Sequence, residues 1–313
     1  MLDAASKTFF HFIAQSRTLK RLASRYGMRK STSFARRFIA GETIAEAIEA
    51  ARIVESRGVL ITLDLLGESV SNLEEAEAAT RGYLAVIDAI VASGIERNIS
   101  LKLTQLGLTI DKATCVDNLR RILDPAARHE FFVRIDMESS PYTQLTLDVF
   151  ETVWSLDFRN VGIALQSSLH RTEQDVRRMN ELGARVRLVK GAYKEPASVA
   201  FQLKADVDAA YTRQMRLLLD HGVYPAIATH DEEIIAETRS YAAERTIGHD
   251  RFEFQMLYGI RRDLQTSLVA EGYGMRIYIP FGKEWFPYFM RRLGERPANV
   301  GFVLRALLGE KSG

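Results

Sequence analysis

The sequence predicts an α/β fold, a (β/α)8 barrel of the TIM type preceded by a helical arm. Eight short apolar runs of β character alternate with longer segments of helical periodicity. The alternation extends over roughly 250 residues, which matches such a barrel in element number and length. The alternative is an open, doubly wound sheet, which normally has a glycine-rich turn after its first strand. The first run here continues into Leu65-Leu-Gly-Glu-Ser without a GxGxxG pattern, and this favours the barrel.

The predicted strands are rich in Val, Ile, Leu and Phe, and several of them end in polar or charged residues. They cover residues 59–65, 99–103, 131–136, 161–166, 186–190, 224–229, 252–256 and 275–279. Their lengths are typical of strands in a parallel sheet that is covered on its outer face.

Helix start and stop signals separate some of these strands. Ser71-Asn-Leu-Glu74 has the spacing of a capping box at the head of a helix that ends at Gly94. Thr172-Glu-Gln-Asp175 predicts the start of another helix, less clearly. Thr43-Ile-Ala-Glu46 is a third capping box, and it lies before the first strand.

The chain divides into an N-terminal helical arm, residues 1–57, and a barrel domain, residues 58–313. The arm contains an Arg- and Lys-rich stretch between Lys20 and Arg37. We interpret this stretch as a solvated helix face rather than as a membrane or nucleic-acid patch. The arm is expected to pack on the barrel.

The composition excludes several functional classes. The 313 residues are 47% hydrophobic and 26% charged, so a large core can form. Forty-two basic and 40 acidic residues give a net charge of +2, which provides no electrostatic reason to expect nucleic acid as a partner. The single cysteine, Cys115, excludes an intrachain disulfide and fits a reducing compartment.

The N-terminus does not have the pattern of a signal peptide, and no apolar stretch approaches the roughly 18 residues of a membrane-spanning helix. We therefore expect a cytoplasmic protein. Peripheral attachment to the inner face of the cell membrane stays open as an alternative.

Candidate functional residues follow from the predicted fold, because barrel enzymes have their sites at the carboxyl ends of the strands. Polar residues at these ends are Lys102, Arg134, Asp136, Gln166, Arg187, Lys190, Thr229, His230 and Tyr278. Beyond the last strand, Arg291 and Arg292 form a pair of guanidinium groups suited to clamp a carboxylate. The convergence of cations indicates an anionic substrate, an anionic cofactor, or both.

Each of these residues also has a purely structural interpretation. An Arg pair is commonly a solvated helix face. Lys102 and Asp136 could form a structural ion pair inside the barrel. None of the histidines has HxH or HExxH spacing, so His230 is expected to be a hydrogen-bonding residue rather than a metal ligand. The pattern around Tyr278 does not decide whether its side chain faces the lumen or the helices.

Eight sequence blocks follow one another in a characteristic order. The blocks are SLKLTQLG (100–107), FFVRIDMESS (131–140), NVGIALQSSLHRT (160–172), RLVKGAYKEP (187–196), IATHDEE (227–233), FEFQMLYGI (252–260), RIYIPFGKEW (276–285) and YFMRRLGERPAN (288–299). Together they resemble the proline dehydrogenase family, specifically its monofunctional bacterial branch. The resemblance covers the chain from the first strand onward. It implies a distorted (β/α)8 barrel that binds FAD and oxidises L-proline to Δ1-pyrroline-5-carboxylate, with hydride transfer to flavin N5. This reaction is the first step of proline degradation to glutamate.

The resemblance also implies roles for individual residues. Arg291, Arg292 and Lys102 match the residues that bind the proline carboxylate, and Asp136 matches the acid that orders these cations. Tyr278, Tyr288 and Leu257 match the wall around the pyrrolidine ring, and Glu295 matches the carboxylate that holds the arginine clamp. The positions that match FAD-binding residues are Met137, Gln166, Arg187, Lys190, Gly191, Ala192, Thr229 and His230. Among these, Arg187 matches an arginine near the flavin N5 edge.

The implied partners follow from the same resemblance. Electrons are expected to pass from the reduced flavin to a membrane quinone, which requires at least transient contact with the membrane. The arm or the apolar stretch 285–289 could make this contact, although simple packing is the plainer interpretation of the stretch. The chain ends at Gly313 without an aldehyde dehydrogenase domain, so a separate pyrroline-5-carboxylate dehydrogenase is expected.

Three rival functions remain open from the residues. Lys190 ends a strand at the position where a Schiff-base aldolase keeps its nucleophile. A folate reductase of the related flavin barrels would depend on NAD(P)H. A non-enzymatic barrel would use its basic mouth only to bind anionic ligands.

Overall fold

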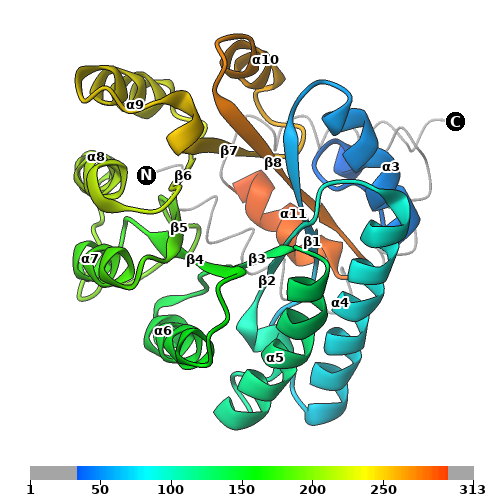
Figure 1. The fold of residues 1–313 in the computed structure, drawn as a ribbon. Coiled ribbons are helices and arrows are strands. Elements are labelled where there is room, and N and C mark those ends of the chain that lie inside the picture. The colour runs from blue at the N-terminus through cyan, green and yellow to red at the C-terminus, as the bar shows by residue number, and fades with distance from the viewer. Residues whose placement is uncertain (1–33, 295–313) are drawn as a thin grey trace, which may run out of the picture.

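The computed structural model describes residues 34–294. It contains a closed barrel of eight parallel strands in which each strand pairs with the next and β8 pairs with β1 (Figure 1). The strands are β1 (Leu60–Leu65), β2 (Asn98–Leu101), β3 (Phe132–Ile135), β4 (Val161–Gln166), β5 (Arg185–Val189), β6 (Ala226–Ala228), β7 (Glu253–Leu257) and β8 (Gly274–Phe281). All eight predicted strands are confirmed, with shifts of a few residues at their ends.

Seven helices follow β1 to β7 in turn and surround the barrel (Figure 1). They are α4 (Leu73–Ser93), α5 (Lys112–Arg128), α6 (Ser140–Ser155), α7 (Thr172–Leu182), α8 (Lys204–His221), α9 (Glu232–Glu244) and α10 (Arg262–Ala270). Three short 3-10 helices also occur, η1 (Phe34–Arg37), η2 (Leu103–Leu106) and η3 (His249–Arg251). Helix α3 (Ile44–Glu55) precedes β1 and packs against β1 and β8.

The last described helix, α11 (Trp285–Gly294), does not extend the outer ring, and Figure 1 shows it within the outline of the barrel. Because α3 covers the outside of β8 and β1, α11 is not needed there. An apolar cluster joins α11 to η1 and to the segments that follow β1 and β7, and it contains Phe38, Leu66, Trp285 and Phe289. The indole nitrogen of Trp285 donates a hydrogen bond to Glu42 at 2.9 Å.

This packing decides the role of the apolar stretch 285–289. Trp285, Phe286, Tyr288 and Phe289 are each at most 7% exposed. Four of the five residues of this stretch are therefore packed in the core. Within residues 34–294, no helix combines the length and the apolar composition needed to cross a bilayer.

The predicted helix starts are partly confirmed. Thr43 and Glu46 form the capping box at the start of α3. In α4 the cap is Asn72, whose side chain accepts from the Glu75 amide, so the prediction of Ser71 was wrong by one residue.

The second correction concerns α7. This helix begins at Thr172 as expected, but its cap position is Arg171 without a side-chain bond. The Thr172 hydroxyl instead donates to the carbonyl of Gln166 and ties the helix to the end of β4.

Alternate residues of each strand point into the barrel lumen, and several of these residues are polar. In β1, Ile61 and Leu63 belong to the apolar core, whereas Thr62 and Asp64 are buried polar residues on the other face. Arg187 of β5 bonds to Ser100 of β2 and Gln255 of β7, contacts that are possible only across the lumen. Burying a charge in the lumen costs free energy unless a partner neutralises it, so the charged residues there are expected in ion pairs.

Candidate active site

A buried ion network links the carboxyl ends of β1, β2, β3 and β8. The Lys102 ammonium group lies 3.1 Å from Asp64 Oδ1 and 3.6 Å from Asp136 Oδ2. It also lies 3.4 Å from the Tyr278 hydroxyl, which donates to Asp136 at 2.8 Å. Tyr278 therefore faces the lumen, which the sequence pattern left undecided.

The electrostatics of this network keep Lys102 charged. Burial by itself would lower the pKa of Lys102, but the two facing carboxylates, Asp64 and Asp136, raise it above its ordinary value. Asp64 is fully buried, and desolvation raises its pKa while the Lys102 charge opposes that rise. Lys102, which directly follows β2, thus has the partners that its burial requires.

Arg187 crosses the lumen from β5 and connects this network to the opposite wall. Its NH1 donates to Asp136 Oδ1 at 2.5 Å, its NH2 to Ser100 at 3.0 Å and its Nε to Gln255 at 2.6 Å. Its guanidinium carbon also lies 5.4 Å from the centroid of the Tyr278 ring. Asp136 consequently contacts both Lys102 and Arg187.

The arginine pair lies on α11, close to the end of β1. Arg291 NH1 donates to Glu68 Oε1 at 2.6 Å, and both side chains are mostly buried. Burial would lower the pKa of Arg291, but Glu68 and Tyr193 raise it. The Arg292 guanidinium lies 5.2 Å from the centroid of the Tyr288 ring. The pair is half-buried, so it is not the solvated helix face of the structural interpretation.

The other predicted residues lie at the carboxyl ends of β3 to β6, on one arc of the barrel rim. Met137 follows β3, Gln166 ends β4, Lys190 to Ala192 follow β5, and Thr229 and His230 follow β6. Leu257 ends β7, and its amide donates to His230 Nε2 at 3.0 Å, so this histidine nitrogen is an acceptor. Within residues 34–294, no group of three or more His, Cys, Asp or Glu side chains has a metal-binding arrangement.

Lys190 is held on the rim by two carboxylates. Its ammonium group donates to Asp208 at 2.5 Å and to Asp231 at 2.7 Å. Burial would raise the pKa of Asp231, but hydrogen bonds and charge from Lys190 and Lys204 lower it to about 2. These two ion pairs hold the side chain in place, whereas a Schiff-base nucleophile must be able to reach a carbonyl carbon.

Glu295, expected to hold the arginine clamp, lies outside the described residues. Sequence reasoning overlooked Asp64, Glu68 and Tyr193. Asp64 could have been found by the argument used for Lys102, since it is a charge inside the apolar run VLITLDL. Glu68 and Tyr193 lie in loops, and only the tertiary structure brings them to Arg291.

A further buried carboxyl group, that of Glu138, lies beside the network. Glu138 follows β3 and accepts from the amide and hydroxyl of Thr104, at 3.1 and 2.5 Å. Burial raises the pKa of Glu138 to about 7, whereas Thr104 and the charge of Lys102 act in the opposite direction. Glu68 is the nearby acidic group that adds to the rise.

Comparison with known proteins places this geometry in a family context. The family profile described as "Proline dehydrogenase" matches residues 47–305. Proline dehydrogenase 1 of Bacillus subtilis is 42% identical over 299 residues, which cover 96% of this chain and 98% of that protein. Proline dehydrogenase of Deinococcus radiodurans is 39% identical over 312 residues, which cover 98% and 99%.

A solved structure with a similar fold is proline utilization A (PutA) from Bdellovibrio bacteriovorus, inactivated by N-propargylglycine. It superposes with a TM-score of 0.78 at 25% identity. The match covers 91% of this chain and only 38% of that much longer one.

We expect Asp64→Asn to destabilise the protein by about 3 kcal/mol, because it leaves the buried Lys102 with only the more distant Asp136 as counter-charge. Urea unfolding at pH 7 measures this change. The control is Glu151→Gln, which removes an exposed partner of Arg178 and should cost less than about 1 kcal/mol. Equal effects of the two substitutions would show that Asp64 is not the residue that stabilises the Lys102 charge.

Glu138 makes the stability depend on pH. Its folded pKa of about 7 lies above the ordinary value of 4.5, so the folded state binds the proton more tightly. Glu138 makes its full contribution to the free energy of unfolding below about pH 4.5. This contribution falls by on the order of 3 kcal/mol as the pH rises to about 7. Urea unfolding from pH 5 to 8 should therefore show a fall that Glu138→Gln removes. A fall of the same size in this variant would assign the effect to another group.

Proposed function

The chain belongs to the proline dehydrogenase family, and from this premise we propose that it oxidises L-proline to Δ1-pyrroline-5-carboxylate with bound FAD, passing the electrons to a quinone. Proline dehydrogenases are oxidoreductases, so the rival functions of a Schiff-base aldolase and of a mere binding barrel are not retained. The observation that carries the proposal is the arrangement of cations at one end of the barrel. Lys102 lies in the lumen, and α11 brings Arg291 and Arg292 to the rim beside it.

The arginine pair would bind the substrate carboxylate. A planar guanidinium presents five N–H donors, and only NH1 of Arg291 is used by Glu68 in the hydrogen bonds described. The remaining donors can form the bidentate contact that carboxylates prefer. Lys102 adds a fixed positive charge from the lumen side of the site. Glu295, beyond the described residues, is proposed to support the same clamp.

The wall of the proposed substrate site is apolar on one side and aromatic on the other. Leu257 is half-buried at the end of β7, and Tyr278 stands on the neighbouring strand β8. Tyr288 lies on α11 within the apolar cluster that also contacts Tyr278. These three side chains suit a small, saturated ring whose carboxylate is held by the cations.

The cation-rich environment also prepares the substrate amine. Nearby positive charges disfavour a protonated amine and lower its pKa, so the neutral form with its lone pair is favoured. Loss of a hydride from the adjacent carbon needs this lone pair. No protein side chain is therefore required as a general base, and Asp136 is assigned the task of holding Lys102 and Arg187 in place.

The residues on the β3 to β6 arc fit a flavin cofactor. Gly191 has a φ of +115° and is exposed, and a Cβ at this position would lie 2.4 Å from Ser168 Oγ. A glycine that leaves its backbone open beside a lysine is suited to the close approach of an anionic ligand. Met137, Gln166, Lys190, Ala192, Thr229 and His230 would line the same cofactor.

Bound FAD would provide the hydride acceptor, its N5 atom, and the electron route to a quinone. Arg187 would act on that cofactor through its charge, since a fixed cation stabilises the negative charge that reduction brings. The ion pair with Asp136 and the bonds to Ser100 and Gln255 hold this cation before any ligand binds. Such preorganisation avoids a reorganisation cost during the reaction.

Two partners complete the proposal. The quinone is expected in a membrane, so contact of the protein with the membrane surface is proposed, with the arm of residues 1–57 as the candidate segment. The product is proposed to pass to a separate pyrroline-5-carboxylate dehydrogenase.

An absorbance spectrum before and after anaerobic addition of L-proline tests the proposal. We expect flavin bands that lose intensity when proline is added. Flavin bands that proline does not change would contradict the substrate but keep the cofactor. A protein without flavin, even after incubation with FAD, would contradict the cofactor as well.

The clamp assignment predicts a separation of substrate and cofactor binding. Arg291→Ala or Arg292→Ala should raise KM for proline about 10- to 100-fold, because each removes a charge-assisted bond worth about 1.5–3 kcal/mol, while flavin stays bound. Steady-state kinetics and the flavin absorbance per protein measure the two effects. Arg178→Ala, an exposed arginine on α7, is the control and should leave KM unchanged. Loss of flavin with unchanged proline affinity would contradict the assignment.

A further inference from the structure

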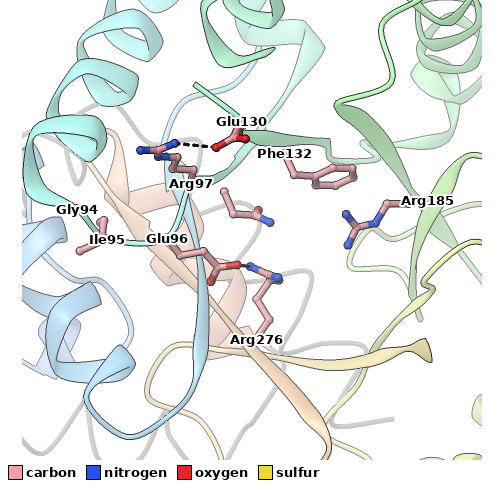
Figure 2. A pocket seen from close by; sticks show the side chains of 9 residues that line it. Gly94, Ile95, Glu96, Arg97, Glu130, Phe132, Arg185 and Arg276 are labelled. Carbon is pink, nitrogen blue, oxygen red and sulfur yellow. Dashed lines mark hydrogen bonds and ion pairs between the residues drawn. The ribbon is translucent and has the colours of Figure 1, made fainter. Parts of the chain in front are cut away.

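A second group of charged residues lies at the amino end of the barrel, opposite the proposed active site. It surrounds a cavity of about 410 Å³ between the first residues of several strands and the loops that precede them (Figure 2). The lining residues are Gly94, Ile95, Glu96, Arg97, Asn98, Glu130, Phe132, Arg185 and Arg276. Neither the substrate nor the cofactor residues proposed above belong to this set.

The carboxylates of this cavity already have partners. Arg276 lies 2.5 Å from Glu96 and 2.8 Å from Glu253, which is buried beneath the cavity. Arg97 lies 3.3 Å from Glu130, as the dashed line in Figure 2 marks. Every carboxylate that lines the cavity is thus bonded to an arginine other than Arg185.

Arg185 is the cation that this pairing leaves without a counter-charge in contact. Its guanidinium carbon lies 4.2 Å from the centroid of the Phe132 ring and 4.5 Å from that of Tyr224. Among residues 34–294, no side chain or carbonyl accepts a hydrogen bond from its guanidinium, and its Nε atom is buried. Leaving this buried Nε–H donor unused costs free energy, and the other guanidinium donors face the cavity.

The electrostatic environment of Arg185 agrees with this geometry. Burial lowers the pKa of Arg185, and the more distant charge of Glu253 only partly compensates. The neighbouring cation Arg276 lowers it further. An anion in the cavity would reverse these effects.

Asn98 provides a second unused polar group in the same cavity. It is the first residue of β2 and only 5% exposed. Its side-chain amide has no hydrogen-bond partner among the described residues, although its backbone amide bonds to the Glu96 carbonyl. A ligand that meets both Asn98 and Arg185 would supply a hydrogen-bond partner to each side chain.

We propose that this amino-end cavity binds a small organic carboxylate, held bidentately by Arg185 and contacted by the Asn98 amide. The two aromatic rings cover the guanidinium, which leaves its edge donors for a planar acceptor. Glu96 and Glu130 at the rim disfavour a doubly charged anion such as hydrogen phosphate. Phe132 provides an apolar wall for the carbon part of the ligand.

Thermal unfolding with sodium acetate as the probe, at ionic strength balanced with sodium chloride, tests this site. At about tenfold excess over Kd, acetate should raise the Tm of the wild-type protein by about 2–4 °C. The rise should vanish in Arg185→Gln, and Asn98→Ala should weaken the apparent Kd several-fold. A rise of the same size in Arg185→Gln would overturn the proposal. So would the absence of any rise in the Tm of the wild-type protein across the acetate titration.

Two comparisons separate this cavity from the carboxylate clamp on α11 and from phosphate binding. Arg291→Ala removes part of the clamp, so the acetate effect should persist in this variant. Loss of the effect in Arg291→Ala and its retention in Arg185→Gln would place acetate at the other end of the barrel and overturn the proposal. An effect of inorganic phosphate, sensitive to Arg185→Gln and larger than that of acetate, would overturn the carboxylate class. The test does not depend on proline oxidation, so it stands apart from the proposed function.

Discussion

Charges inside the barrel must neutralise one another, and this requirement organises the rest of the structure. Asp136 pairs with Arg187 and lies beside Lys102, whereas Glu253 pairs with Arg276 further down the lumen. A buried charge without a partner costs several kcal/mol, so each of these side chains constrains the next. The lumen is therefore filled by paired charges, and apolar residues cover the outer face of the strands.

The two ends of the barrel lumen differ in how completely the charges are paired. At the carboxyl end, α11 adds Arg291 and its partner Glu68 above the Lys102 network. The cations Lys102, Arg187 and Arg291 are each paired with a carboxylate at this end. At the amino end, the carboxylates are used by Arg97 and Arg276, and Arg185 rests between aromatic rings.

The position of α11 has a physical cause that begins before the barrel. Helix α3 precedes β1 and occupies the outer face of β8 and β1, where the eighth helix of a regular barrel would pack. The apolar side of α11 is covered instead by the η1 segment, where Phe38 packs against Phe289. Helix α3 and the η1 segment are thus the described part of the arm that leaves α11 at the end of the barrel, with Arg291 and Arg292 near the carboxyl end of β1.

The sequence by itself determined the eight strands and which polar residues lie at their carboxyl ends, because strand patterning is local. It could not determine the direction of Tyr278, the burial of 285–289 or the partner of Arg291. These depend on which distant segments meet: Glu68 and Arg291 are more than 200 residues apart and come together only when α11 crosses the barrel end. The same holds for Arg185, since a charge is recognised as unpaired only after every neighbour has been placed.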